Sequence, residues 1–157
     1  MNNIIELDSI LSAWAENVIQ RIQANLESTG TNASGRTSDS LEYELTDTGL
    51  MIVGRPYFQG VEQGRPGGKV PYRFQDIIRK WMDDKNISSQ FGEKEWQKRN
   101  AAYMIANFIA ENGTKLYREG GRTDIYTDVI DEELEKLGEQ ISIKVDEFVR
   151  TNINYGK

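Results

Sequence analysis

The chain lacks cysteine and histidine, the two side chains that supply much of the nucleophilic and metal-binding chemistry of proteins; neither occurs among its 157 residues. Without cysteine there is no thiolate nucleophile, disulfide or thiolate zinc site, and without histidine there is no Ser-His triad and no His-ligated metal. Only carboxylate, Lys, Tyr or Ser side chains would remain for an enzyme site. We therefore expect a protein that is not an enzyme and that has no cofactor or metal site.

Long apolar runs and a surplus of positive charge are also missing. No apolar run approaches the roughly 20 residues of a membrane helix, so we expect no membrane contact. The chain has 19 Lys plus Arg against 25 Asp plus Glu, a formal charge of -6. Proteins that read duplex DNA neutralise its phosphates with clustered basic residues, so sequence-specific DNA binding is not expected. An acidic protein can still surround DNA without gripping it.

Two sequence features resemble binding sites, a glycine-rich loop and an acidic run, but neither has the pattern that such a site requires. The loop Gly67-Gly68-Lys69 has glycines and a lysine, as phosphate loops do, but Val70-Pro71 follows where a Walker loop needs Ser or Thr and the start of a helix. The acidic run at 131–133 does not converge on a cation, because neighbours on a helix point in different directions. We expect the loop to be either mobile or ordered by a partner, and the acids to be solvated helix surface.

The spacing of apolar residues predicts most of the secondary structure. Apolar residues three and four apart predict helices over 4–28, 72–85 and 93–112. The third carries apolar residues on more than one face, so we expect it to be the central helix, ended by a left-handed cap at Gly113. A last long helix is expected from Asp124 to about Asn154, with Asp124 as its N-cap.

A β-hairpin is predicted between the first two helices. Residues 41–45 alternate between apolar side chains and glutamates, as in a half-buried strand, and 46–49 supply a turn. Residues 50–53 are all apolar, which predicts a return strand covered on both faces. Since two strands alone are marginal in water, the hairpin must pack on helices or be extended by another chain. We expect one α+β domain over 1–157, mostly helical, with a small antiparallel hairpin and a long C-terminal helix.

Several short motifs then follow one another in a recognisable order. Ser34-Gly35 and Ser40 precede the hairpin, and Tyr57 and the run Val61-Glu62-Gln63-Gly64-Arg65 come after it. A Pro-Gly-Gly-Lys-Val-Pro loop at 66–71, a helix containing Trp81, an Ala-rich stretch at 101–106 and Gly113-Thr114 complete the series. In this order the sequence resembles the tail-completion, or neck, proteins of tailed bacteriophages and prophages. It departs from them after Gly113-Thr114, where many members carry a Pro-Phe-Leu-like segment.

The resemblance implies a structural role in a virion. Copies would form a homo-oligomeric ring at the head-to-tail junction, joining the portal or adaptor side to the tail and leaving a channel through which DNA passes without sequence-specific binding. The protein would be made in the host cytoplasm and end in the neck region. The alternative is a non-viral, small helical protein-binding or regulatory module, which would be a monomer or dimer.

Ring closure needs a heterologous interface, in which one patch of each subunit meets a different patch of the next. The hairpin edge and the 65–71 loop are the expected patch on one side, and the long last helix is the expected patch on the other. The candidate interface residues are Arg55, Tyr57, Glu62, Arg65, Lys69 and Arg122. Because an acidic lining repels passing DNA, the candidate channel-facing residues are Asp131, Glu132, Glu133 and Glu135. An ordinary solvated helix face is the alternative for these four acids.

Overall fold

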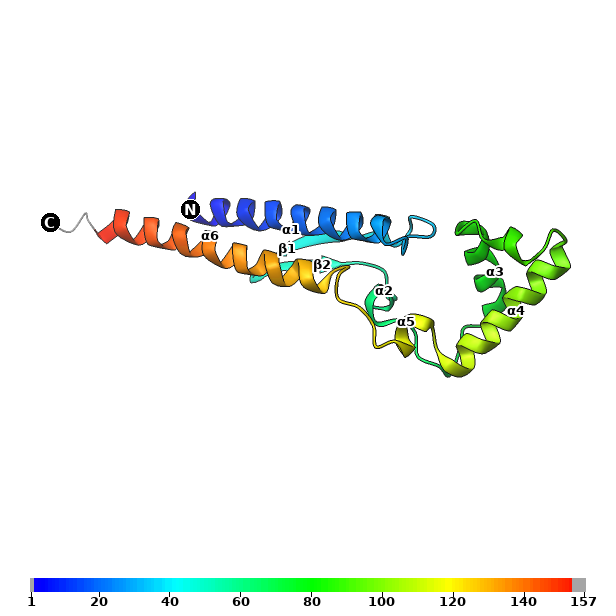
Figure 1. Cartoon of the computed structure of the whole chain (residues 1–157). Coiled ribbons are helices and arrows are strands. Elements are labelled where there is room, and N and C mark those ends of the chain that lie inside the picture. Colours follow the sequence, from blue (N-terminus) through cyan, green and yellow to red (C-terminus); the bar gives the residue numbers. More distant parts are fainter. Residues whose placement is uncertain (1, 154–157) are drawn as a thin grey trace.

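The computed structural model describes residues 2–153 and has the predicted α+β composition, mostly helical with one antiparallel hairpin and a long last helix (Figure 1). Two short 3-10 helices lie at Ser38–Ser40 and Ser88–Phe91. The other elements are α1 (Asn2–Ser28), β1 (Glu42–Thr46), β2 (Gly49–Val53), α2 (Gly60–Gln63), α3 (Phe74–Asp84), α4 (Glu95–Asn112), α5 (Lys115–Arg118) and α6 (Thr127–Ile153).

The two long helices form a rod with the hairpin. In Figure 1, α1 and α6 run antiparallel and side by side, and the strands lie along them. Apolar residues four apart on α1 make the core of the rod, which is completed by residues from the chain before β1 and around the start of α6. Its buried members are Val18, Ile22, Leu26, Leu41, Ile125 and Val129. We use "rod" below for α1, the hairpin and α6.

The hairpin is covered on one face. Its register pairs Tyr43 with Ile52, so these two share the face that packs on α1, and pairs Glu44 with Met51 on the other. Met51 is 48% exposed, which makes the prediction of a strand covered on both faces wrong. The reason is that α1 is the main element packed on these strands in the described part of the chain, and it lies on one side.

Helices α3 and α4 form a second unit at the end of the rod, called the arm below (Figure 1). The arm has its own apolar cluster, in which Ile78 and Met82 of α3 pack on Ala102 and Ala106 of α4. The expectation that 93–112 is the central helix is therefore wrong. The main contacts of α4 are with α3 and the second 3-10 helix, and its Trp96 is 63% exposed. Helix α4 carries more apolar side chains than its one partner helix can cover.

Among residues 2–153, none of the helices combines the length and the apolar character needed to cross a membrane.

Candidate functional site

Two of the motifs, the run at 61–65 and Gly113-Thr114, lie where the rod joins the arm. Glu62, on α2, is 2% exposed, and its carboxylate meets the start of α6. The Glu62 Oε1 atom accepts hydrogen bonds from the backbone N–H groups of Ile125, Tyr126 and Thr127, at 3.0, 2.6 and 3.0 Å. Oε2 accepts the Thr127 hydroxyl at 2.5 Å. The first N–H groups of a helix lack partners within it, and its positive end favours a carboxylate, so Glu62 caps α6 from a distant part of the sequence.

This cap corrects two predictions. Glu62 was a candidate for contact with a neighbouring subunit, but its carboxylate is buried and bonded within its own chain, so we assign it an intrachain role. Asp124 was expected to be the N-cap of the last helix, which begins instead at Thr127. The carboxylate of Asp124 accepts two hydrogen bonds from Arg122, at 2.5 and 2.6 Å, and this guanidinium holds the pKa of Asp124 below its usual value.

The chain crosses itself where it enters and leaves the arm. The backbone N–H of Arg65 donates to the Thr114 hydroxyl and the N–H of Thr114 donates to the Arg65 carbonyl, both at 2.9 Å. The N–H of Gly68 donates to the Ala110 carbonyl at 2.7 Å. A Cβ on Gly67 would lie 2.6 Å from the carbonyl oxygen of Glu111, so the backbones approach closely. The first half of the glycine-rich loop is thus ordered against the chain's own residues.

The side chain of Arg65 serves the same crossing. Its Nη2 donates to the Lys69 carbonyl at 2.7 Å, and its guanidinium carbon lies 5.3 Å from the centre of the Phe74 ring. Arg65 and Arg122 are therefore engaged within the chain. The other predicted interface residues, Arg55, Tyr57 and Lys69, are exposed, and Tyr57 is 82% exposed.

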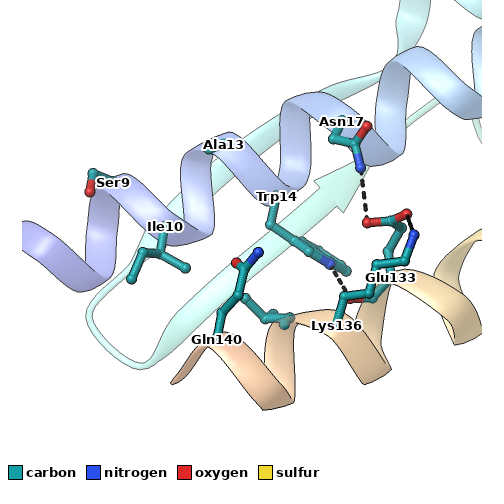
Figure 2. A pocket seen from close by; sticks show the side chains of 9 residues that line it. Ser9, Ile10, Ala13, Trp14, Asn17, Glu133, Lys136 and Gln140 are labelled. Atoms are coloured by element: carbon teal, nitrogen blue, oxygen red, sulfur yellow. Dashed lines mark hydrogen bonds and ion pairs between the residues drawn. The ribbon is translucent and has the colours of Figure 1, made fainter. Parts of the chain in front are cut away.

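Two of the four acids predicted to face a channel hold α6 to α1 instead. Glu133 is 5% exposed and accepts hydrogen bonds from Asn17 at 2.9 Å, Arg21 at 2.5 Å and Lys136 at 2.7 Å. Glu132 accepts one from Arg21 at 2.7 Å. Figure 2 shows Glu133 at a pocket of about 410 Å³ between the two helices, beside Trp14.

The remaining two acids, Asp131 and Glu135, lie on the exposed surface of α6. The residues that sequence reasoning missed are Arg21 and Trp14, whose indole N–H donates to the Glu133 carbonyl at 2.8 Å. The sequence did contain a sign that Arg21 has a specific role, because it is the only basic residue between 2 and 28.

The pH dependence of folding should report this contact. The pKa of Glu133 is held below its ordinary value of about 4.5 by the Lys136 hydrogen bond first and by Arg21, against the raising effect of burial. A pKa lowered in the folded state stabilises the fold fully above the ordinary value, and this contribution is lost as pH falls through the lowered one. We expect Glu133→Gln to lower the free energy of unfolding at neutral pH by about 1–3 kcal/mol, and the difference from wild type to shrink in acid.

Denaturant unfolding of both proteins across this pH range measures the effect. Glu132→Gln is the matched control, since its side chain is 58% exposed and also pairs with Arg21; an exposed pair contributes only about 0–1 kcal/mol. A Glu133→Gln deficit that stays constant down to acid pH would contradict the assignment.

Large apolar side chains remain on the surface of both the rod and the arm. On α4 these include Trp96, Tyr103, Met104 and Phe108; on α6 they include Leu134, Ile143, Val145 and Val149. Monomeric soluble proteins rarely expose large contiguous apolar patches, and such patches mark interaction surfaces. Within residues 2–153, no cluster of three or more acidic side chains is placed to hold a metal ion.

No protein-family model matches this chain, and none of the curated proteins or solved structures matches it.

Proposed function

We propose that this chain is a structural subunit of the head-to-tail junction of a tailed bacteriophage, a tail-completion or neck protein whose copies form a ring around a DNA channel. Its partners would be other copies of itself and the portal, adaptor and tail proteins. The ordered series of motifs from Ser34 to Thr114 supports the family assignment. The observation that carries the assembly role is the exposed apolar surface on both rod and arm, which neighbouring subunits would cover.

The acidity of the surface supports passage of DNA without retention. Asp131 and Glu135 are the acids of α6 that stay candidates for a channel lining, because Glu132 and Glu133 are engaged with Arg21. A lining of acids repels phosphates, whereas retention of DNA requires basic contacts. A ring structure in which Asp131 and Glu135 face outward would remove this part of the proposal.

The mass of the purified protein in solution, measured over a range of concentrations and repeated with phage particles or portal present, tests the proposal. We expect a closed ring with an axial opening in negative-stain images, or a monomer that is recruited into a ring on the particle. A monomer or dimer that never associates with particles would contradict it and favour the regulatory module.

A further inference from the structure

Charge is divided unevenly between the two parts of the molecule. Residues 65–118, which run from the crossing through the arm to the end of α5, have eleven Lys or Arg against six Asp or Glu, a formal charge of +5. The rest of the chain has eight against nineteen, a formal charge of -11. A single subunit thus carries two surfaces of opposite sign, and oppositely charged surfaces attract and orient each other during association.

The acids of the basic segment are largely neutralised by neighbours within it. Asp76 pairs with Arg73, Asp83 and Glu95 pair with Arg79, and Asp84 pairs with Lys80. These ion pairs involve three of the eleven basic residues of the segment. Among the remaining basic residues, Lys69, Lys94, Arg99 and Arg118 are exposed, so the segment presents a net positive surface.

A stripe on α4 combines this charge with aromatic surface. Trp96, Arg99 and Tyr103 are spaced three and four residues apart, so they lie on one side of the helix. Trp96 is 63% and Tyr103 56% exposed, and Arg99 is exposed between them. Trp, Tyr and Arg are the residues most enriched at the centres of protein interfaces. We call these three residues the α4 stripe.

Helix α6 carries the opposite pattern from its second turn onward. Asp131, Glu135 and Glu139 follow at intervals of four and form one exposed row. Leu134 lies beside this row, three residues after Asp131, and Val145 and Val149 continue the exposed apolar surface toward the end of the helix. We call these six residues the α6 face. It offers apolar area with a negative border, which is the complement of the α4 stripe.

We infer that the α4 stripe of one copy docks on the α6 face of a second copy. Trp96 and Tyr103 cover Leu134 and Val145, while Arg99 and the basic surplus of the arm face the acidic row. We place the contact between copies because the arm lies beyond one end of the rod, whereas α6 starts at that end and runs away from the arm along the rod (Figure 1). The inference deepens the proposed function, since it names the two patches of the subunit interface.

The interface is heterologous: a docked pair keeps one free α6 face on one copy and one free α4 stripe on the other, so further copies can add. This differs from the patches expected from the sequence, because the arm replaces the hairpin edge and the 65–71 loop as the first patch. The acidic row on α6 and the basic residues of the arm steer and orient the docking. The aromatic side chains of the stripe supply most of the apolar surface that the docking buries.

A charge-swap mixture tests the pairing. The arm variant is Arg99→Glu, in the stripe, with Lys94→Glu, at the residue just before α4. The rod variant is Glu135→Lys with Glu139→Lys, and all four positions are exposed. At low salt we expect each variant alone to self-associate roughly tenfold more weakly than wild type, because its stripe and face now carry like charge. An equimolar mixture should recover oligomers containing the two variants in equal number, since the acidic stripe of one fits the basic face of the other. Sedimentation velocity and native mass spectrometry measure both effects.

A matched control makes the same change of charge at another place on the rod. Glu42→Lys with Glu44→Lys changes the exposed outer face of the hairpin, and this variant should not restore assembly of the arm variant. Circular dichroism checks that each variant is folded. Variants that form rings as wild type does would overturn the pairing and leave the proposed ring function standing. Failure of the mixture to recover assembly would likewise overturn the pairing.

Two further outcomes are decisive. A wild-type protein that self-associates neither alone nor on particles would overturn both the pairing and the proposed function. Binding of duplex DNA that is lost in the arm variant, under salt conditions in which wild type does not self-associate, would assign the basic arm to nucleic acid and overturn the pairing.

Discussion

Replacing Glu62 by alanine is expected to lower the free energy of unfolding by about 3–5 kcal/mol, because the change leaves several buried donors without a partner. Three backbone N–H groups at the start of α6 and the Thr127 hydroxyl all donate to this one carboxylate. Water reaches the site poorly, since Glu62 itself is 2% exposed. The alanine variant also loses the favourable interaction between the carboxylate and the positive end of the α6 dipole.

Denaturant unfolding followed by circular dichroism measures this loss. Glu62→Gln should fall between wild type and Glu62→Ala, because an amide oxygen can still accept from the backbone but carries no charge. Gln63→Ala is the matched control: the neighbouring residue of the same helical turn is exposed and should shift the unfolding free energy by no more than about 0.5 kcal/mol. An alanine variant as stable as Gln63→Ala would show that α6 does not depend on this cap.

The secondary structure was predictable from the sequence because it depends on local periodicity. The expected helix at 4–28 is found as α1 (Asn2–Ser28), and the alternation at 41–45 is found as β1 (Glu42–Thr46). These elements each have an apolar repeat that matches one backbone period. Gly113 ends α4 with a positive φ of 77°, as its position predicted, although its ψ of 175° is not that of a left-handed cap.

The arrangement of the elements was less predictable. The apolar residues of α4 indicate burial on several sides, yet only the face with Ala102 and Ala106 packs on α3. Periodicity reports which side chains are apolar and does not say whether their partner belongs to the same chain or to another one. The exposure of Trp96 and Tyr103 is therefore informative only once the fold is known.

The candidate site shows the same limit for polar residues. Glu62 and Thr127 are 65 residues apart in the sequence, and no local pattern links an acid in a Gly-rich stretch to the start of a distant helix. Asp124 had the right residue type and place for an N-cap, but its pairing with Arg122 and the carboxylate of Glu62 decided the outcome. A tertiary cap replaced the local one that residue preferences favour.

Replacing Gly113 by alanine is the second change for which we expect a large effect. Gly113 combines a φ of 77° with a ψ of 175°, a backbone conformation that is essentially restricted to glycine and costs other residues about 1–3 kcal/mol. Its Cβ would also lie 2.7 Å from the Arg65 carbonyl oxygen and 3.0 Å from the Gly67 nitrogen. These neighbours are backbone atoms held by the Arg65–Thr114 hydrogen bonds, so they cannot move aside without breaking the crossing. Together the two effects should lower the unfolding free energy by about 3–5 kcal/mol.

Gly120→Ala separates the two causes of this loss. Gly120 also has a positive φ, of 89°, but a Cβ there would meet nothing within 4 Å, so its alanine variant carries backbone strain without the clash. We expect Gly120→Ala to cost about 1–2 kcal/mol and Gly113→Ala clearly more, measured by denaturant unfolding. Because the crossing fixes the arm to the rod, Gly113→Ala should also increase amide hydrogen exchange in residues 65–68 and 110–114, whereas Gly120→Ala should not. Equal losses from the two variants would mean that the close approach at Gly113 contributes nothing, and that glycine is needed there for its backbone angles alone.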